Sequence, residues 1–409
     1  MKFRVVVPFA VAVLALAGCS QGESSPSASL SPTAVVSASP SISALVSQLM
    51  SEADAAKLQK QVAKTVATSG GELTSLVVGV WDPDKGFAVA AAGDAVTDPQ
   101  RAASADDQFR IASITKTFVS TLVLQQVAQG TIDLDGTVAE YDPELAAKYP
   151  QIGTRTIRQL LSMRSGLPDF EKTLTGSAAS NPEFSTKTWT ADDLIAAAMS
   201  SGKVTKADAK KAVYSNTNYI VLGQVLEAVT GKSVKDLVTE NIIEPLNLTR
   251  TVYPDAADTS LSDPHSNGYI APSGVEDLTA DGGTIEPGTD VTDWSASWGG
   301  AAGVMSSTIQ DLAIWAATGF GSDLLPPGVA TERASFTPLT AGGEYGLGLQ
   351  HFGDWTGHTG GIPGWSTLAM RNDKTGTVVV MATNSSGQYG GLLHLGLLLK
   401  MYPGTVTLD

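Results

Sequence analysis

The chain has 409 residues, of which 43% are hydrophobic and 16% are charged. This length and composition fit a globular protein with one large or two moderate domains, and they exclude a largely disordered chain. The formal net charge of −15 is not offset by any run of Lys and Arg, so we expect no nucleic-acid partner.

The N-terminal segment predicts export to the cell surface. Two basic residues precede an apolar stretch over 5–17, which is too short to span a bilayer and is typical of a signal peptide. The string Leu16-Ala-Gly-Cys19 resembles a bacterial lipobox, which implies that residues 1–18 are removed and that Cys19 carries a lipid. An ordinary secretory leader with an incidental cysteine is the alternative. Because Cys19 is the only cysteine, a disulfide within the chain and a thiolate zinc site are excluded.

Residues 19–43 are rich in Ser, Pro and Ala, and they contain no repeating apolar pattern. Such a segment cannot bury enough apolar surface to fold, so we expect a tether between the lipid and a domain over 44–409. The whole pattern predicts an extracytoplasmic, membrane-anchored bacterial lipoprotein.

The domain begins with apolar residues at helical spacing, from Leu45 and Leu49 to Leu58, Val62 and Val66. Further elements follow in chain order, and their apolar patterns and turn residues predict the following bounds. The expected elements are a strand at 73–81, a turn at 82–86, a strand at 87–92, a helix at 113–129, a helical and loop-rich region at 140–290, a helix at 309–317, strands at 345–352, 366–371 and 377–383, and a helix at 392–401.

Strands at both ends with helices between them predict an α/β (α+β) fold. One antiparallel sheet is expected from 44–139 and 291–409, flanked by N- and C-terminal helices, with a mainly helical subdomain at 140–290. A cleft between the two parts is the expected place for a site.

Ser113 and Lys116 are three residues apart on a predicted helix, so both side chains face the same way. A lysine can accept the proton of a serine hydroxyl if its own pKa is lowered. Alone, Ser113 also fits a plain helix cap, and Ser200-Ser-Gly-Lys203 shows the same spacing.

Two further strings supply matching groups. Tyr214-Ser-Asn216 offers a phenol that can relay protons and an amide that can hold a carbonyl, although it also fits an ordinary loop before a helix. His358-Thr-Gly-Gly361 lies at the end of a predicted strand, where two glycines let a substrate backbone approach. Lys374-Thr-Gly376 is a competing match, but its neighbours are typical of a hairpin turn.

In this order, the three strings resemble the serine DD-peptidases and class C β-lactamases, with their esterase and aminopeptidase relatives. Phe109-Arg-Ile-Ala-Ser-Ile-Thr-Lys116, Leu160-Leu-Ser-Met-Arg-Ser-Gly-Leu167 and Gly360-Gly-Ile-Pro-Gly-Trp365 also resemble the family. The resemblance covers about residues 50–400.

The resemblance implies a role for each matching residue. Ser113 is the acylated nucleophile, Lys116 its first proton acceptor and Tyr214 the relay, while Asn216, His358, Thr359, Gly360 and Gly361 bind the substrate. The N–H groups of Ser113 and Gly361 would form the oxyanion hole. Class C β-lactamases usually carry Lys where this chain has His358, whereas DD-carboxypeptidase-like members can carry His, and Gly361 lacks the hydroxyl often found at its position. A neutral imidazole is expected to hold a substrate carboxylate less firmly than an ammonium does, and the missing hydroxyl weakens this binding further.

The sequence thus predicts a serine hydrolase of the cell envelope, foremost a D-alanyl-D-alanine carboxypeptidase or penicillin-binding relative acting on peptidoglycan peptides. An esterase or β-lactamase of the same fold is the first alternative, and a non-catalytic peptide- or partner-binding lipoprotein is the second. We expect a monomer without cofactor. No metal is expected either, because the remaining histidines show no ligand spacing.

Overall fold

The computed structural model describes residues 48–407 except 176–177, 281, 321–322 and 388–389. Cys19 and the predicted leader and tether lie outside the described residues. The strands are β1 (Ser75–Asp82), β2 (Gly86–Thr97), β3 (Gln100–Ala102), β4 (Phe109–Arg110), β5 (Tyr269–Ile270), β6 (Ser306–Ser307), β7 (Thr337–Pro338), β8 (Glu344–Tyr345), β9 (Gln350–Phe352), β10 (Trp355–Ile362), β11 (Trp365–Asn372), β12 (Val378–Thr383) and β13 (Ser385–Ser386).

The helices alternate with these strands and fill the middle of the chain. They are α1 (Glu52–Ala67), α2 (Thr115–Gln129), α3 (Val138–Tyr141), α4 (Pro143–Lys148), α5 (Pro150–Gly153), α6 (Ile157–Leu161), α7 (Glu171–Thr175), α8 (Glu183–Thr186), α9 (Ala191–Ser201), α10 (Thr217–Thr230), α11 (Val234–Val238), α12 (Val275–Leu278), α13 (Gly300–Gly303), α14 (Ile309–Gly319), α15 (Pro327–Arg333) and α16 (Gly390–Met401), with short turns η2 (Ala112–Ile114), η3 (Thr239–Ile243), η4 (Pro272–Gly274) and η5 (Ser297–Gly299).

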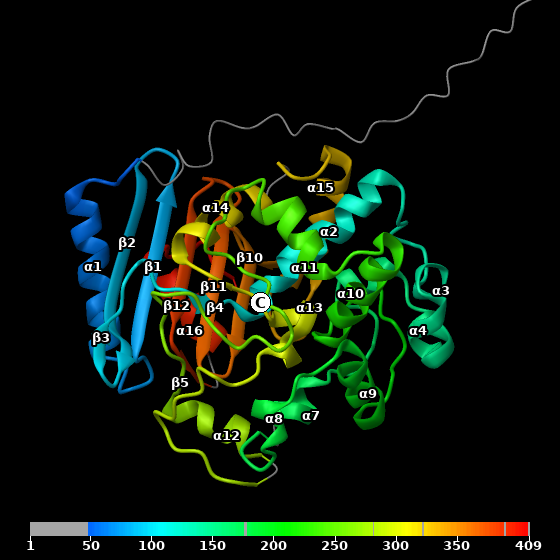
Figure 1. Ribbon diagram of the computed structural model, residues 1–409. Helices are drawn as coiled ribbons and strands as arrows, with labels where there is room; N and C mark the ends of the chain where they lie inside the picture. Colours follow the sequence, from blue (N-terminus) through cyan, green and yellow to red (C-terminus); the bar gives the residue numbers. More distant parts are fainter. Residues whose placement is uncertain (1–47, 176–177, 281, 321–322, 388–389, 408–409) are drawn as a thin grey trace, which may run out of the picture. The chain divides into compact units, whose positions relative to one another are not determined.

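The main sheet confirms the expected fold. In the described part of the chain its nine strands run in the order β3-β2-β1-β12-β11-β10-β9-β8-β7. Their pairings are antiparallel, and β1 pairs with β12, so the two ends of the domain meet in the sheet centre. Figure 1 shows the helices of the middle region gathered beside the sheet.

The sheet has an apolar core on each face. Alternate residues of a strand point to opposite faces. Val78 and Val80 therefore pack with Leu58 and Val62 of α1, while Val77 packs into the larger core that includes α2 and α14.

The predicted first helix is wrong at its start. Leu49 precedes α1, forms a bridge with Phe87 and is 74% exposed. Ser51 caps the helix instead, because its side chain accepts the Asp54 N–H. Helical spacing alone could not locate this boundary.

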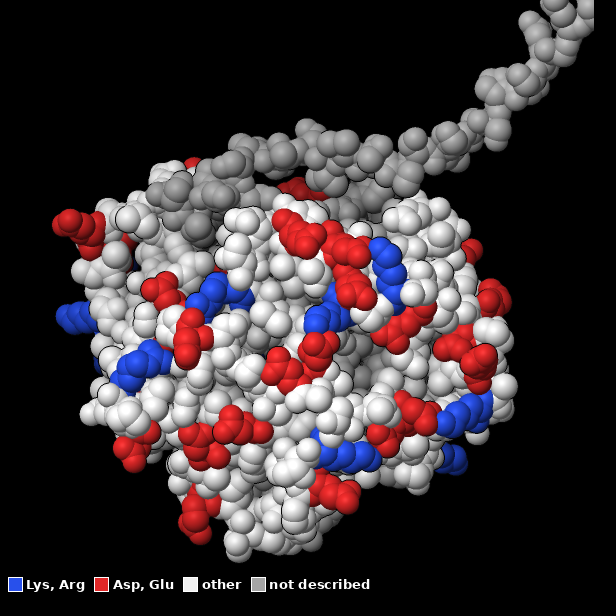
Figure 2. Space-filling model, in the orientation of Figure 1, with Lys and Arg blue, Asp and Glu red and all other residues white. Residues whose placement is uncertain are grey.

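The predicted helical region at 140–290 also contains a short strand. β5 pairs in parallel with β13, which follows the central strand β12, and so ties this region to the sheet. Within the described ranges, no helix has the length and apolar character needed to cross a membrane. Acidic and basic side chains are interspersed on the face shown in Figure 2.

Candidate active site

Ser113 and Lys116 lie where a short turn enters α2. Ser113 is the middle residue of η2, and Lys116 is the second residue of α2. The Lys116 Nζ donates a hydrogen bond of 2.9 Å to the Ser113 Oγ. Ala112, just before the serine, has a φ of 49°, a left-handed conformation that costs energy for a residue with a Cβ. The expected pairing of the two side chains is therefore present.

The amine of Lys116 is fully buried and is surrounded by oxygen atoms. Besides the Ser113 Oγ, it donates to the Asn216 Oδ1 and to the Ala302 carbonyl, both at 2.7 Å. Burial disfavours the ammonium and lowers the pKa of Lys116 to about 7, although nearby Glu171 and Asp169 act in the opposite direction. Near neutral pH the amine can therefore lose a proton.

The neutral amine has one obvious partner for its lone pair. The Asn216 Oδ1 and the Ala302 carbonyl can only accept hydrogen bonds, so they take the two N–H groups that remain. The lone pair then faces the Ser113 hydroxyl. This is the arrangement that removal of the serine proton needs.

Tyr214 lies in the loop before α10, next to the same amine. The Lys116 Nζ is 5.1 Å from the centre of the Tyr214 ring, and the phenol lies near enough to Ser113 for that residue to favour its ionised form. Burial raises the pKa of Tyr214 well above its usual value, and the Ser113 contact offsets only part of this rise. Tyr214 is thus a protonated phenol at rest.

Two carboxylates that the sequence analysis did not select complete the polar side of the site. The Asn216 Nδ2 donates to Glu171 and, at 3.2 Å and 3.3 Å, to both carboxylate oxygens of Asp169. These contacts orient the amide so that its oxygen faces Lys116. Burial and neighbouring Asp169 raise the pKa of Glu171 to about 7. In the sequence, only their position shortly after the family-like segment that ends at Leu167 could have pointed to Asp169 and Glu171.

His358 lies inside β10 rather than at the end of a strand, and its side chain is fully buried. Its Nε2 is 3.0 Å from the Tyr345 hydroxyl, and its ring centre is 6.1 Å from that of Tyr214. Burial and the charge of Lys116 lower the pKa of His358 to about 3, so the imidazole is neutral near pH 7. Its ring packs beside that of Tyr214, and it offers no positive charge to a ligand.

The glycines after His358 let β10 approach η2 closely. A Cβ on Gly360 would lie 2.4 Å from the Ile111 carbonyl oxygen and 2.3 Å from the Thr367 Oγ1. A Cβ on Gly361 would meet nothing within 4 Å. The Thr359 backbone N–H and side chain both donate to the Gln350 Oε1. Gly360 is thus required by packing, whereas Gly361 faces open space.

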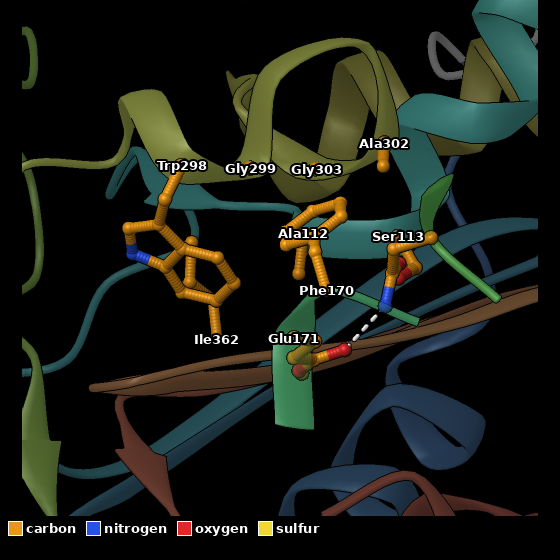
Figure 3. Close-up of a pocket in the computed structure, with 11 residues that line it drawn as sticks. Ala112, Ser113, Phe170, Glu171, Trp298, Gly299, Ala302, Gly303 and Ile362 are labelled. Carbon is orange, nitrogen blue, oxygen red and sulfur yellow. Dashed lines mark hydrogen bonds between the residues drawn. The ribbon is translucent and has the colours of Figure 1, made fainter. Parts of the chain in front are cut away.

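A hollow of about 250 Å³, counted with its solvent-open part, joins these groups (Figure 3). Its polar lining comes from Ser113, Glu171 and Asn216. Its other lining residues are Ala112, Phe170, Trp298, Gly299, Ala302, Gly303, Gly361 and Ile362. Figure 3 shows Trp298 and Ile362 together at one end of the hollow and Ser113 at the other. His358, Thr359 and Gly360 are not among the lining residues.

The two competing strings lie elsewhere. Lys374 is in the turn between β11 and β12, where its Nζ is 2.7 Å from Asp354. Its side chain is 74% exposed, which confirms the predicted hairpin. Ser200 is near the end of α9, and Lys203 is exposed beyond it. Among the described residues, no group of His, Cys, Asp and Glu is arranged to hold a metal.

Comparison with known proteins identifies the family to which the chain belongs. The beta-lactamase family pattern matches residues 46–395, and the chain belongs to this family of serine hydrolases. Among solved structures, a D-stereospecific amidohydrolase from Streptomyces sp. is 28% identical with a TM-score of 0.72, and the match covers 86% of this chain and 100% of that one. The D-amino acid amidase from Ochrobactrum anthropi SV3 is 27% identical with a TM-score of 0.70, over 82% and 93% of the two chains.

Curated relatives match over shorter stretches. Protein flp from Staphylococcus aureus (strain COL) is 29% identical over 38% of this chain and 30% of its own length. The D-alanyl-D-alanine-carboxypeptidase/endopeptidase AmpH from Escherichia coli (strain K12) is 30% identical over 37% of this chain and 38% of its own length. The chain therefore matches well under half the length of these relatives.

Proposed function

We propose that this protein hydrolyses amides or esters through an acyl-enzyme on Ser113. The observation that carries the proposal is the buried Lys116 amine, whose lone pair faces the Ser113 hydroxyl while two acceptor oxygens hold its N–H groups. In the first step Lys116 takes the hydroxyl proton and the Ser113 Oγ forms a bond to the substrate carbonyl carbon.

The leaving group departs when its bond to the carbonyl carbon breaks. Lys116 returns the proton to it through Tyr214, whose phenol is protonated and lies near Ser113. Water then attacks the acyl-enzyme, with its proton passing to the same groups, and releases the acid and free Ser113. The N–H groups of Ser113 and Gly361, which both line the hollow, would bind the negative oxygen of each intermediate.

We further propose that the substrate carries an ammonium group on the acyl side of the scissile bond. The Glu171 and Asp169 carboxylates lie beside Asn216, so this end of the hollow favours a cation and repels a carboxylate. His358 is neutral and buried, so it provides no compensating positive charge. A D-amino acid amide or a peptide with a free D-residue at its N-terminus meets these requirements, in line with the amidase relatives.

A D-alanyl-D-alanine carboxypeptidase is the second candidate, and the likeness to AmpH favours it. Its substrate needs a group that holds a terminal carboxylate. Of the groups described here, only Lys116 offers a positive charge at the hollow, and three oxygens already bind it. The narrower carboxypeptidase prediction therefore stays a prediction.

Matched substrates separate the candidates. We expect kcat/KM for D-phenylalanine 4-nitroanilide to exceed that for its N-acetyl form at least tenfold, and Glu171→Gln to narrow this ratio. Glu244→Gln, an exposed carboxylate change outside the hollow, is the control. Equal turnover of the two anilides would refute amine recognition. Release of D-alanine from an N-acylated D-alanyl-D-alanine peptide, with no anilide turnover, would favour the carboxypeptidase.

For the segment before the domain, we propose lipid attachment at Cys19, supported by the Leu16-Ala-Gly-Cys19 string. The proposed setting is the outer face of the cytoplasmic membrane, where peptides of the cell wall are available. Metabolic labelling with radioactive palmitate in a bacterial host should mark the wild type and not Cys19→Ala. Equal labelling of both proteins would refute this attachment site.

A further inference from the structure

A second cavity lies behind α13, away from Ser113; its volume is about 340 Å³, or about 950 Å³ when its solvent-open part is counted as it was for the hollow. Gly299, Ala302 and Gly303 line the hollow at Ser113, whereas Gly300 and Ala301 line the second cavity. The rest of its wall comes from α9, α10 and α11, from the residues just before α9 and α11, from residues 253–256, and from Ser297 and Val304. Figure 1 shows where these helices lie. The volume is within the range of about 300–1,000 Å³ typical of small-molecule sites.

The walls of this cavity are held in place by contacts among its lining residues and by one contact on the other side of α13. The Trp189 backbone N–H donates to the Ser297 Oγ at 2.8 Å, which joins the start of α9 to the segment before α13. A Cβ on Gly223 would lie 2.9 Å from the Ala301 Cβ, so α10 packs directly on α13. The Ala302 carbonyl is bound to Lys116 on the other side. The cavity is therefore formed before any ligand enters.

The inner surface of the cavity is apolar. Five of its lining residues are buried aliphatic side chains. They are Leu194, Ile220, Val234, Ala301 and Val304. A ligand with a hydrocarbon or aromatic body would remove this surface from water, which stabilises a complex by roughly 25 cal/mol per Å².

The polar lining carries a carboxylate without a cation. The two oxygens of Glu227 accept hydrogen bonds of 3.1 Å from the Val234 N–H and from the Gln224 side chain. No ion pair of Glu227 occurs among the described residues. At the rim, Lys235 is already paired with Asp255 at 2.8 Å. The ionisable groups of the lining thus leave one negative charge unmatched.

Tyr253 adds a free hydroxyl near this carboxylate. Within the residues that the structure describes, its hydroxyl forms no hydrogen bond, although the side chain lines the cavity. Burial and the Glu227 charge raise the pKa of Tyr253, so the phenol stays protonated. A half-buried hydroxyl without a protein partner can form a hydrogen bond with the polar atom of a ligand.

From this geometry we infer a second ligand site, between α9, α10, α11 and α13, for a small molecule with an apolar body and a primary ammonium group. The apolar body packs on Leu194, Ile220 and Val234. The ammonium binds the Glu227 carboxylate, and the Tyr253 hydroxyl contacts the same polar end. The site is separate from the hollow at Ser113, and the inference does not depend on the proposed hydrolysis.

Isothermal titration calorimetry with 2-phenylethylamine tests this site. We expect binding to the wild type and to Glu244→Gln, and at least tenfold weaker binding to Glu227→Gln. In that variant the side-chain oxygen can still accept from the Val234 N–H, and the Gln224 amide can turn so that its own oxygen accepts from the new N–H group, so we expect the fold to be preserved. Tyr253→Phe, which removes only the hydroxyl, is expected to weaken binding several-fold. The neutral analogue 2-phenylethanol should bind at least tenfold more weakly than the amine.

Several outcomes of these measurements would refute the site. Equal affinity of the amine for the wild type and for Glu227→Gln, or equal affinity of the amine and the alcohol, would overturn the inference. Loss of binding in Glu171→Gln with full binding in Glu227→Gln would place the amine at Ser113 and also overturn it. The thermal unfolding midpoint of each variant, measured in parallel, identifies any variant that does not fold.

Discussion

Replacement of Glu171 by Gln should shift the pH at which the enzyme becomes active. Acylation needs the neutral form of Lys116, so kcat/KM is expected to rise with pH through the pKa of this residue, which burial lowers to about 7. The Glu171 carboxylate stabilises the ammonium and so raises this pKa. Without that carboxylate, the rising limb should move to lower pH.

The size of the shift follows from the geometry. Asn216 bridges Lys116 and Glu171 through its amide. Across one amide and two hydrogen bonds the charges are about 7 Å apart, and at an effective dielectric constant of about 20 they interact by roughly 2 kcal/mol. Because the pKa of Glu171 is itself raised to about 7, the carboxylate is only partly ionised there. We therefore expect a shift of about one pH unit.

A neutral aryl ester such as 4-nitrophenyl acetate isolates this effect, because it has no amine for Glu171 to bind. The assay measures kcat/KM from pH 5 to pH 9 for the wild type, Glu171→Gln and the exposed control Glu244→Gln. The rise of kcat/KM with pH could instead be unchanged in Glu171→Gln, or it could move to higher pH. Either result would refute the assignment of Lys116 as the group that titrates.

Further predictions concern packing, acid stability and the competing string. Gly360→Ala should lower the free energy of unfolding by roughly 1–3 kcal/mol, measured by urea denaturation, because its Cβ would contact the backbone. The matched Gly361→Ala should lower this free energy far less. Equal losses in the two variants would contradict the packing described for Gly360. The folded-state pKa values of His358 and His394 are lowered to about 3 and about 4, so the unfolded chain binds more protons below pH 6.5. The free energy of unfolding should thus fall as the pH is lowered from 6.5 to 4, by roughly 1.4 kcal/mol per pH unit for each histidine. The same dependence on pH in His394→Gln as in the wild type would disprove the contribution of His394. Lys374→Ala should retain the wild-type kcat/KM. A tenfold loss would indicate that the turn at Lys374 takes part in the active site.

The local part of the site was predictable from the sequence. Three-residue spacing at a helix start is enough to bring Ser113 and Lys116 together, since helix geometry sets their distance. The hairpin at Lys374 was predictable for the same reason, because neighbouring turn residues determine it. The sheet made from both ends of the domain followed from the positions of the strand patterns.

Features set by packing between distant segments were not predictable. His358 was expected to face a substrate, but in the structure it lies behind Tyr214 and contacts Tyr345. No pattern near Glu171 indicated that it would meet the Asn216 amide from another part of the chain. The pKa shifts depend on burial, which single-residue patterns do not determine.

Covalent labelling of Ser113 tests the central claim most directly. A carbamoylating aryl ester transfers a group that is slow to hydrolyse, so intact mass spectrometry can detect the adduct. We expect one carbamoyl group per wild-type chain, located at Ser113 in the tryptic peptide from Ile111 to Lys116, and none in Ser113→Ala. Labelling of another residue, or equal labelling of Ser113→Ala, would contradict it.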